Sequence, residues 1–258
     1  METELQKHET SESKTDLESK KIRPKGNKVL NILIFIGLMI FCTTPTAIAM
    51  GVVGLAFTKQ NILLVLVLIL IGILWTGFVI WVVRGYYQRH TYEKPKQTFK
   101  PKDVGINLAY FLGIRLVVGL LTIVMSKVYS EDVTENDKAI MGVFDQVKDI
   151  NFEVVLGIIV LFVVITFVAP YLEELTFRGI FKESLFSRHF FWLPLILSSV
   201  IFSINHASTN LIGFLMYALI GVLLYLAYQR RGNIKDSMMV HMLNNGVAST
   251  TLIIMIFM

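Results

Sequence analysis

The run VVLGIIVLFVVITFVA, from Val154 to Ala169, is apolar apart from one threonine and one glycine. It leads almost directly into YLEELTFRG, from Tyr171 to Gly179. Further apolar runs bring the hydrophobic residues to 54% of the 258-residue chain, and several approach or exceed the roughly 20 residues that a helix needs to cross a bilayer. Lipid allows only helices or closed barrels to span, and continuous rather than alternating runs exclude the barrel. The sequence therefore predicts an all-α polytopic membrane protein.

Seven transmembrane helices are predicted from the apolar runs. Their expected bounds are 29–57, 61–83, 104–125, 152–170, 191–207, 211–228 and 234–258. The interruption Thr43-Thr44-Pro45-Thr46 should kink or break the first helix, because proline removes a helical hydrogen bond. Residues 1–28 are polar without a periodic apolar face, so we expect a disordered cytoplasmic tail there and a transmembrane domain over 29–258.

Charges in the loops predict how the chain crosses the membrane. The loop between Arg84 and Asp103 holds six basic and two acidic residues, and the stretches after the fourth and sixth spans are also basic. The loop between Lys127 and Glu153 holds seven acidic and three basic residues. By the positive-inside rule, the N-terminus of this multi-pass cell-membrane protein is cytoplasmic and its C-terminus is outside. Membrane orientation explains the net charge of +5 without a nucleic-acid partner.

Three charged residues, Glu173, Glu174 and Arg178, follow the fourth span. Ionisable groups at such a place are costly and are by default candidates for function. Residues four apart share a helix face, so Glu174 and Arg178 are expected to pair. Glu173 is rotated by about 100° and is free to face another partner. The alternative is that all three are interfacial charges held by water and lipid headgroups.

Two histidines and an asparagine lie within later spans. His206 ends the run that begins at Phe202, which places the aromatic ring one helical turn before the imidazole. His241 begins a run in which Asn245 lies one turn further along. A lone histidine in a span is usually a hydrogen-bonded core residue, but these residues and Glu173 on three different spans indicate a site.

Such a group of side chains supports two kinds of chemistry. A glutamate and two histidines can bind zinc with a water as fourth ligand. Alternatively, a glutamate and a histidine deprotonate a water without a metal, and an asparagine amide stabilises the oxyanion that forms when this water adds to a carbonyl. The helical zinc signature, two histidines four apart with a glutamate between them, is absent from the sequence.

Two further residues within spans lie outside this group. Cys42 is the only cysteine, so no intrachain disulfide is available, and we expect it to be a small buried apolar side chain. Arg115 is either the partner of a buried acid or the mark of a span that starts later. The favoured interpretation is a basic side chain near a span end that reaches the interface.

Three motifs on the late spans resemble the CAAX-protease and bacteriocin-processing (CPBP, or Abi) family of intramembrane glutamic endopeptidases. The family shows Glu-Glu-x-x-x-Arg, then Phe-x-x-x-His, then His-x-x-x-Asn. All three are complete here, over 173–178, 202–206 and 241–245. The resemblance covers roughly the C-terminal half, implies an active site in a cavity among the late helices, and places the catalytic core at about 152–258.

The resemblance implies a metal-independent protease that uses no cofactor. Glu173 and His206 would activate the water, and Asn245, helped by His241, would form the oxyanion hole. Supporting roles would fall to the other motif residues, namely Glu174, Arg178 and Phe202.

Partners implied by the resemblance are membrane lipid and a peptide or protein substrate. Eukaryotic relatives trim prenylated proteins, whereas bacterial relatives include bacteriocin-immunity and peptide-processing proteins. Two alternatives stay open, namely a non-proteolytic immunity or scaffold protein and a zinc-dependent membrane peptidase. The sequence makes no prediction of the oligomeric state.

The depth of the residues is the main difficulty. With about 1.5 Å of rise per residue, His206 lies some 20 Å along a span that begins at the inner surface, and His241 only about 10 Å into its own. Both reach Glu173 only if the fifth span is tilted, begins deeper, or if residues 177–190 dip into the membrane. We expect a water-filled cavity open to the cytoplasm and lined by the fourth, fifth and seventh spans.

Overall fold

The protein is described by a computed structural model over residues 26–59, 61–91, 98–144, 150–187 and 189–257. These residues form helices and contain no strand, which confirms the predicted fold class. Nearly all of the predicted tail, 1–28, lies outside the described residues. The helices outside the central segment are α2 (Lys28–Lys59), α3 (Ile62–His90), α4 (Pro101–Tyr129), α5 (Glu135–Met141), α9 (Trp192–Asn205), α10 (Leu211–Gln229) and α11 (Ile234–Phe257).

The central segment is one helical rod from Phe152 to Leu185. It consists of α6 (Phe152–Val163), η1 (Val164–Val168), α7 (Ala169–Glu174), η2 (Leu175–Ile180) and α8 (Phe181–Leu185), where η1 and η2 are π-helical turns. The predicted end of this span at residue 170 is therefore wrong.

Proline at position 170 does not end the helix because it follows a π-helical turn. In η1 the Ala169 N–H donates to the carbonyl of Val164, five residues back. In this register Pro170 would donate to Ile165, but proline has no N–H. The carbonyl of Ile165 accepts instead from the Asn245 side chain, at 3.1 Å. A neighbouring helix thus supplies the donor that Pro170 lacks, which is how membrane helices tolerate proline.

Helix α2 likewise continues through its interruption. Pro45 lies inside it, and its missing N–H would leave the carbonyl of Phe41, four residues back, without a donor. The hydroxyl of Thr44 donates to that carbonyl at 2.8 Å and accepts from the Trp75 indole N–H, also at 2.8 Å. Of the kink or break expected at this position, the break is therefore not found.

Six described helices are long and apolar enough to cross a membrane, at 28–58, 62–90, 101–129, 152–185, 211–229 and 234–255. The remaining predicted span, the fifth, corresponds to α9, which has 14 residues. At 1.5 Å per residue it covers about 21 Å, less than the roughly 30 Å hydrocarbon core. Helix α9 therefore ends within the protein, where His206 caps it.

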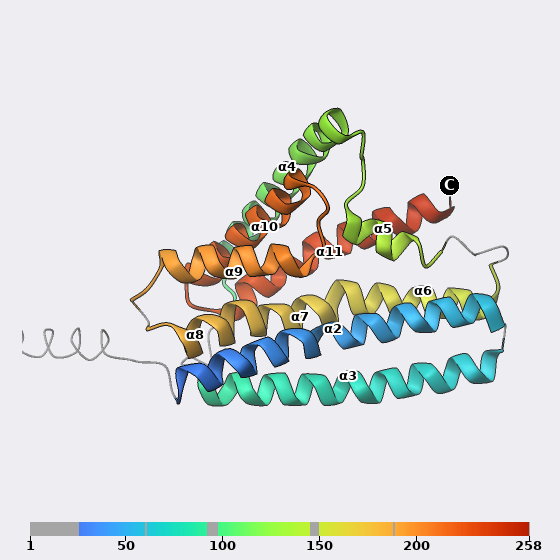
Figure 1. Ribbon diagram of the computed structural model, residues 1–258, viewed down its shortest axis with the longest axis horizontal. Helices are drawn as coiled ribbons and strands as arrows, with labels where there is room; N and C mark the ends of the chain where they lie inside the picture. The colour runs from blue at the N-terminus through green and yellow to red at the C-terminus, as the bar shows by residue number, and fades with distance from the viewer. Residues whose placement is uncertain (1–25, 60, 92–97, 145–149, 188, 258) are drawn as a thin grey trace, which may run out of the picture.

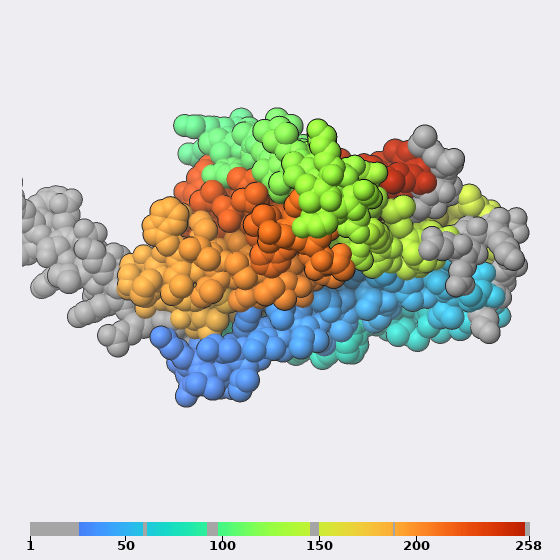
Figure 2. Space-filling view, turned by 45° about the horizontal axis from the view of Figure 1, so that its top comes forward, coloured from blue at the N-terminus to red at the C-terminus, as the bar shows by residue number. Residues whose placement is uncertain are grey.

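The helices form two groups. In one, α2, α3 and the rod lie side by side, and in the other α9, α10 and α11 lie on the opposite side of the rod with α4 beyond them (Figure 1). Figure 2 shows α9 and α10 at the surface between α2 and α4. Close approach of α9 and α10 depends on Gly221, because a Cβ there would lie 2.9 Å from the Cα of Ser199. Small residues at such contacts are the usual means of packing membrane helices.

An ion-pair network ties the start of α4 to the turn between α10 and α11. Asp103 is bound by Arg230 at 2.9 Å and by Arg231 at 3.0 Å, and buried Asp236 is bound by Arg231 at 2.8 Å. This network lies at the end of the bundle that the loop charges predict to be cytoplasmic. It joins segments more than 100 residues apart and so fixes α4 against the late helices.

Candidate active site

The predicted site residues converge at the middle of the rod. Oε2 of Glu173 lies 3.9 Å from Nε2 of His206 and 3.8 Å from Nε2 of His241. The side chain of Glu173 is 16% exposed, against 14% for His206 and 2% for His241. Glutamate and imidazoles from the rod, the end of α9 and the interior of α11 thus face one another in a nearly enclosed space.

Continuation of the rod explains how these residues reach one depth. Glu173 lies 12 residues before Leu185, about 18 Å at 1.5 Å per residue. His206 lies 14 residues after Trp192, about 21 Å along α9. The segment after residue 177 thus continues the rod, in agreement with one of the three possibilities raised by the sequence. It stays helical to residue 185 rather than lying at the surface.

A buried ion pair supports one side of the site. Nε of Arg178 lies 3.4 Å from Oε2 of Glu174, and neither side chain is exposed. The other oxygen of Glu174 lies 2.8 Å from Nδ1 of His241. Burial excludes the alternative that Glu174 and Arg178 are interfacial charges in contact with water and headgroups. The i,i+4 spacing predicted their pairing, and the structure confirms it.

Aromatic and backbone groups complete the surroundings of Arg178. Its guanidinium carbon lies 4.5 Å from the ring centre of Phe202, within the range of a cation–π interaction, and its Nη2 donates to the Gly221 carbonyl at 3.3 Å. The same Phe202 ring packs 4.2 Å from His206, centre to centre. Phe202 therefore contacts both the buried cation and the imidazole, and its contact with the imidazole is the one that its spacing predicted.

Hydrogen bonds determine which nitrogen of each histidine faces Glu173. Nδ1 of His206 lies 2.8 Å from the carbonyl of Phe202, and Nδ1 of His241 lies 2.8 Å from the carboxylate of Glu174. A carbonyl oxygen and a carboxylate only accept, so we assign the proton of each ring to Nδ1. In the neutral rings Nε2 is then the acceptor, and both Nε2 atoms point at Glu173.

Oε2 of Glu173 is buried and has no hydrogen-bond partner among the described residues. A buried polar atom of this kind requires an explanation. Its distances of 3.8 and 3.9 Å to the two imidazoles are too long for direct hydrogen bonds, and contacts of this length are typically bridged by water. Glu173 and one of the imidazoles are thus placed to accept the two hydrogens of a single bridging water molecule.

The carboxamide of Asn245 is oriented by two neighbours. Its Nδ2 donates to the carbonyl of Ile165, and its Oδ1 accepts from Nδ2 of Asn244 at 3.4 Å. Oδ1 of Asn244 in turn accepts from Nη1 of Arg115 at 3.4 Å. Arg115 lies in the middle of α4, so the interpretation that it reaches the interface from near a span end is wrong. One N–H of Asn245 stays available for a ligand, because an amide nitrogen carries two.

A cavity of about 120 Å³ adjoins His206 and Asn245. Its lining comes from α4, α5, α10 and α11 as well as from Ile165 and His206, and includes Arg115, Asp137 and Tyr217. The expected cavity was open to the cytoplasm. This one instead lies where the short α9 ends, and it is covered by α5, which belongs to the loop predicted to be outside. Tyr217, which the sequence analysis missed, stacks on the His206 ring at 4.6 Å.

Helix α5 places a half-buried acid, Asp137, against this cavity, which makes its docking pH-dependent. Burial raises the pKa of Asp137 above its ordinary value, and the Thr134 hydroxyl, which donates to its carboxyl at 2.9 Å, opposes this. His206 and Arg115, which face it, also oppose the increase. The pKa of Asp137 is therefore higher in the folded protein than in the unfolded chain. Its contribution to the stability of the docked α5 is complete below the unfolded pKa and is lost as pH rises through the folded pKa.

We therefore expect hydrogen exchange of the α5 amides, corrected for intrinsic rates, to accelerate as pH rises through the folded pKa of Asp137. Asp137→Asn keeps a neutral side chain and should abolish this pH dependence. Asp132→Asn, at another position of the same cavity wall, is the matched control and should retain it. Identical pH profiles for the native chain and Asp137→Asn would contradict this assignment.

The distances between Oε2 of Glu173 and the two Nε2 atoms can be compared with the spacing of ligand atoms around zinc. Zinc binds imidazole nitrogen and carboxylate oxygen at about 2.0–2.2 Å, which puts tetrahedral ligand atoms roughly 3.3 Å apart. The Nε2–Oε2 distances of 3.8 and 3.9 Å exceed this spacing. Among the described residues, no three His, Cys, Asp or Glu side chains form a group that could hold a metal ion. The arrangement does not fit zinc as it stands.

Fold and site together define a polytopic helical membrane protein with a glutamate, histidine and asparagine cluster inside the bundle. Residues 155–247 match the family model described as type II CAAX prenyl endopeptidase, Rce1-like. The matched segment covers less than half of the chain and contains every predicted site residue, so this part of the chain is similar to the domain of that membrane endopeptidase family. The match confirms the resemblance inferred from the three motifs. Comparison with curated proteins and with solved structures gives no significant match.

Proposed function

We propose that this protein is an intramembrane endopeptidase that hydrolyses a peptide bond with a water activated by Glu173 and His206, without a metal. The observation that carries the proposal is the buried Oε2 of Glu173, which faces Nε2 of both histidines at 3.8–3.9 Å and lacks a hydrogen-bond partner among the described residues. A water there donates one hydrogen bond to Glu173 and a second one to His206. Its oxygen lone pair then points away from both acceptors, toward a substrate carbonyl.

The reaction follows from the remaining donors. As the water oxygen bonds to the carbonyl carbon, Glu173 takes a proton, and the charge moves to the carbonyl oxygen. The free N–H of Asn245 stabilises this oxyanion. His241 helps in its imidazolium form, in which Nε2 carries a proton while Nδ1 donates to Glu174. When the C–N bond breaks, the proton passes from Glu173 to the leaving amine, so that the products are one carboxyl and one amino terminus. Glu174 and Arg178 hold His241 and Phe202 in place and do not touch the substrate.

The substrate and the orientation are also proposals. We infer a location in the cell membrane with the N-terminus cytoplasmic and the C-terminus outside, since the basic and acidic loops alternate. A site nearly enclosed by helices suits membrane-associated peptides or proteins. Two roles are consistent with this chemistry, namely processing of such peptides and self-immunity against a bacteriocin.

Comparative peptidomics tests the proposal. Membranes from cells that express the native chain should contain peptide products that are absent with Glu173→Gln at equal protein level. If the two sets of peptides agree while the variant stays folded, the protein is a non-proteolytic immunity or scaffold protein whose polar cluster serves only its structure.

A zinc-dependent peptidase is the second candidate, because the hydrogen bonds of the two histidines resemble those of zinc-binding histidines. A histidine that binds zinc through Nε2 usually donates Nδ1–H to a carbonyl or carboxylate, as both histidines do here. Purified protein treated with a strong chelator and analysed for bound metal distinguishes the candidates. We expect full activity with no stoichiometric metal, whereas loss of activity that added zinc restores would establish the metalloenzyme.

Replacement of Asn245 by alanine tests the oxyanion hole. Loss of one such donor typically lowers kcat by about 10²–10³-fold, and KM should change little because the interaction forms in the transition state. Asn244→Ala, which removes only the neighbour of Asn245, should have a smaller effect on kcat. Equal effects of the two substitutions, or a change confined to KM, would contradict the role of Asn245.

A further inference from the structure

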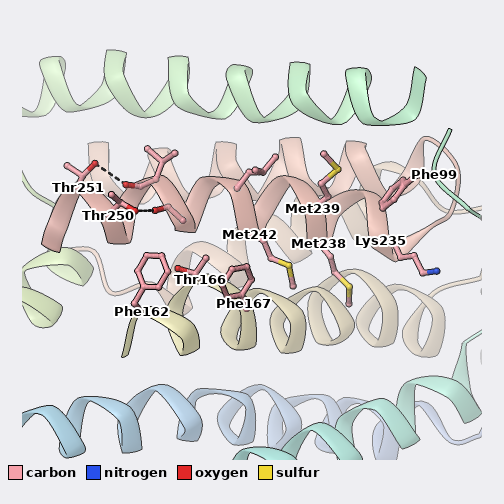
Figure 3. A pocket seen from close by; sticks show the side chains of 13 residues that line it. Phe99, Phe162, Thr166, Phe167, Lys235, Met238, Met239, Met242, Thr250 and Thr251 are labelled. Carbon is pink, nitrogen blue, oxygen red and sulfur yellow. Dashed lines mark hydrogen bonds between the residues drawn. The ribbon is translucent and has the colours of Figure 1, made fainter. Parts of the chain in front are cut away.

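A long apolar groove runs along the face of α11 that turns away from the catalytic residues. Its volume is about 810 Å³, and it extends along α11 from Lys235 to Thr251, about 24 Å at 1.5 Å per residue. Figure 3 shows Met238 and Met242 reaching from α11 toward the ribbon that carries Phe162 and Phe167. The catalytic residues Glu173, His206, His241 and Asn245 do not line it.

The polar groups along this groove are bonded within the protein. The hydroxyls of Thr250 and Thr251 donate to carbonyls of their own helix, at 2.7 and 2.9 Å (Figure 3), and the hydroxyl of Thr166 is bonded to that of Ser249 at 2.9 Å. An extended peptide in this groove would leave its backbone groups without partners, which is costly in a membrane. A hydrocarbon chain carries no such groups, and the methionines adapt to its shape.

At the Lys235 end the groove meets a second, more polar chamber of about 610 Å³. Lys235 and Met238 line both cavities, so the two lie next to each other. The chamber is further lined by α3, through Arg84, Gln88 and Thr91. It lies at the end of the bundle that the loop charges predict to be cytoplasmic.

The chamber carries positive charge. Arg84 and Lys235 are exposed, and neither side chain has a hydrogen bond or ion pair with the rest of the described chain. No acidic residue occurs among the described residues that line the two cavities. A molecule that fits both parts must therefore have an anionic head and a long apolar chain.

We propose that an anionic phospholipid of the cytoplasmic leaflet occupies this site, with its phosphate between Arg84 and Lys235 and one acyl chain along α11. The groove exceeds the roughly 15 Å depth of one leaflet, half of the hydrocarbon core, so it accepts a full acyl chain. The bound chain covers the face of α11 opposite the catalytic residues. This assignment does not depend on the proposed proteolytic activity.

Native mass spectrometry of the full chain in detergent tests the site, with added phosphatidylglycerol as the anionic probe and phosphatidylcholine as the zwitterionic comparator. The native chain should retain phosphatidylglycerol in preference to phosphatidylcholine. Arg84→Gln combined with Lys235→Gln should weaken its binding roughly 30-fold, since each basic charge near an anionic surface contributes about fivefold in affinity. The control is Lys28→Gln combined with Lys102→Gln, two exposed cations that line neither cavity.

A second variant tests the groove itself. Val247→Trp fills the groove without changing charge, since Val247 is 39% exposed and lines it, and should also reduce retention of phosphatidylglycerol. Unfolding midpoints equal to that of the native chain establish that each variant is folded. Equal retention of the two lipids by the native chain would overturn the proposal. Unchanged binding in the Arg84/Lys235 variant or in Val247→Trp would do so as well.

Discussion

Glu173→Gln is expected to lower kcat by about 10²–10⁴-fold, the usual contribution of a general base. The amide has nearly the shape of the carboxylate but cannot take a proton from the water. KM should change little, because the substrate carbonyl does not contact this group before the water attacks. The measurement is single-turnover cleavage of a peptide that depends on the native chain, with purified protein in detergent or liposomes.

Stability separates a catalytic loss from a folding defect in this experiment. Oε2 of Glu173 has no hydrogen-bond partner among the described residues, so the amide should not lower the unfolding midpoint. Glu153→Gln, in the first turn of the same rod, is the matched control and should keep full activity. A Glu173→Gln variant that cleaves at the native rate would remove the general base from the mechanism.

The sequence predicts the parts of this site that depend on spacing along one helix. The separation of four residues predicted the contact of Glu174 with Arg178 and that of Phe202 with His206, and both are observed. The convergence of Glu173 with two histidines was inferred from the presence of ionisable residues within three different spans, and the resemblance to a family suggested their roles. Their catalytic roles are predictions that await the experiments above.

What the sequence could not give depends on contacts between distant segments. The fourth span was predicted to end at residue 170, because only the structure shows that the helix continues and that Asn245 supplies a donor to Ile165. A proline within an apolar run, with a carboxamide on another span, is the signal that could have been used. The position of α5 over the cavity could not be predicted, since it rests on tertiary contacts such as Thr134 with Tyr217 at 3.0 Å.

Removal of either member of the buried pair Glu174 and Arg178 is expected to destabilise the protein strongly. Glu174→Gln leaves the guanidinium without a counter-charge, and Arg178→Met leaves the carboxylate without one. An uncompensated buried charge of this kind typically costs about 3–5 kcal/mol. Denaturant unfolding of protein in mixed micelles measures the change in free energy. Glu135→Gln, which breaks an exposed pair with Lys138, is the control and should change the stability little.

The double variant Glu174→Gln with Arg178→Met distinguishes the two roles of this pair. It removes both charges, so its loss of stability should be much smaller than the sum of the single losses. Activity should not recover in parallel, because a glutamine no longer offers Nδ1 of His241 a charged acceptor at 2.8 Å. Additive losses of stability would show that the two side chains do not depend on each other. Recovery of activity together with stability would show that Glu174 is needed only to neutralise Arg178, and that His241 is oriented by other contacts.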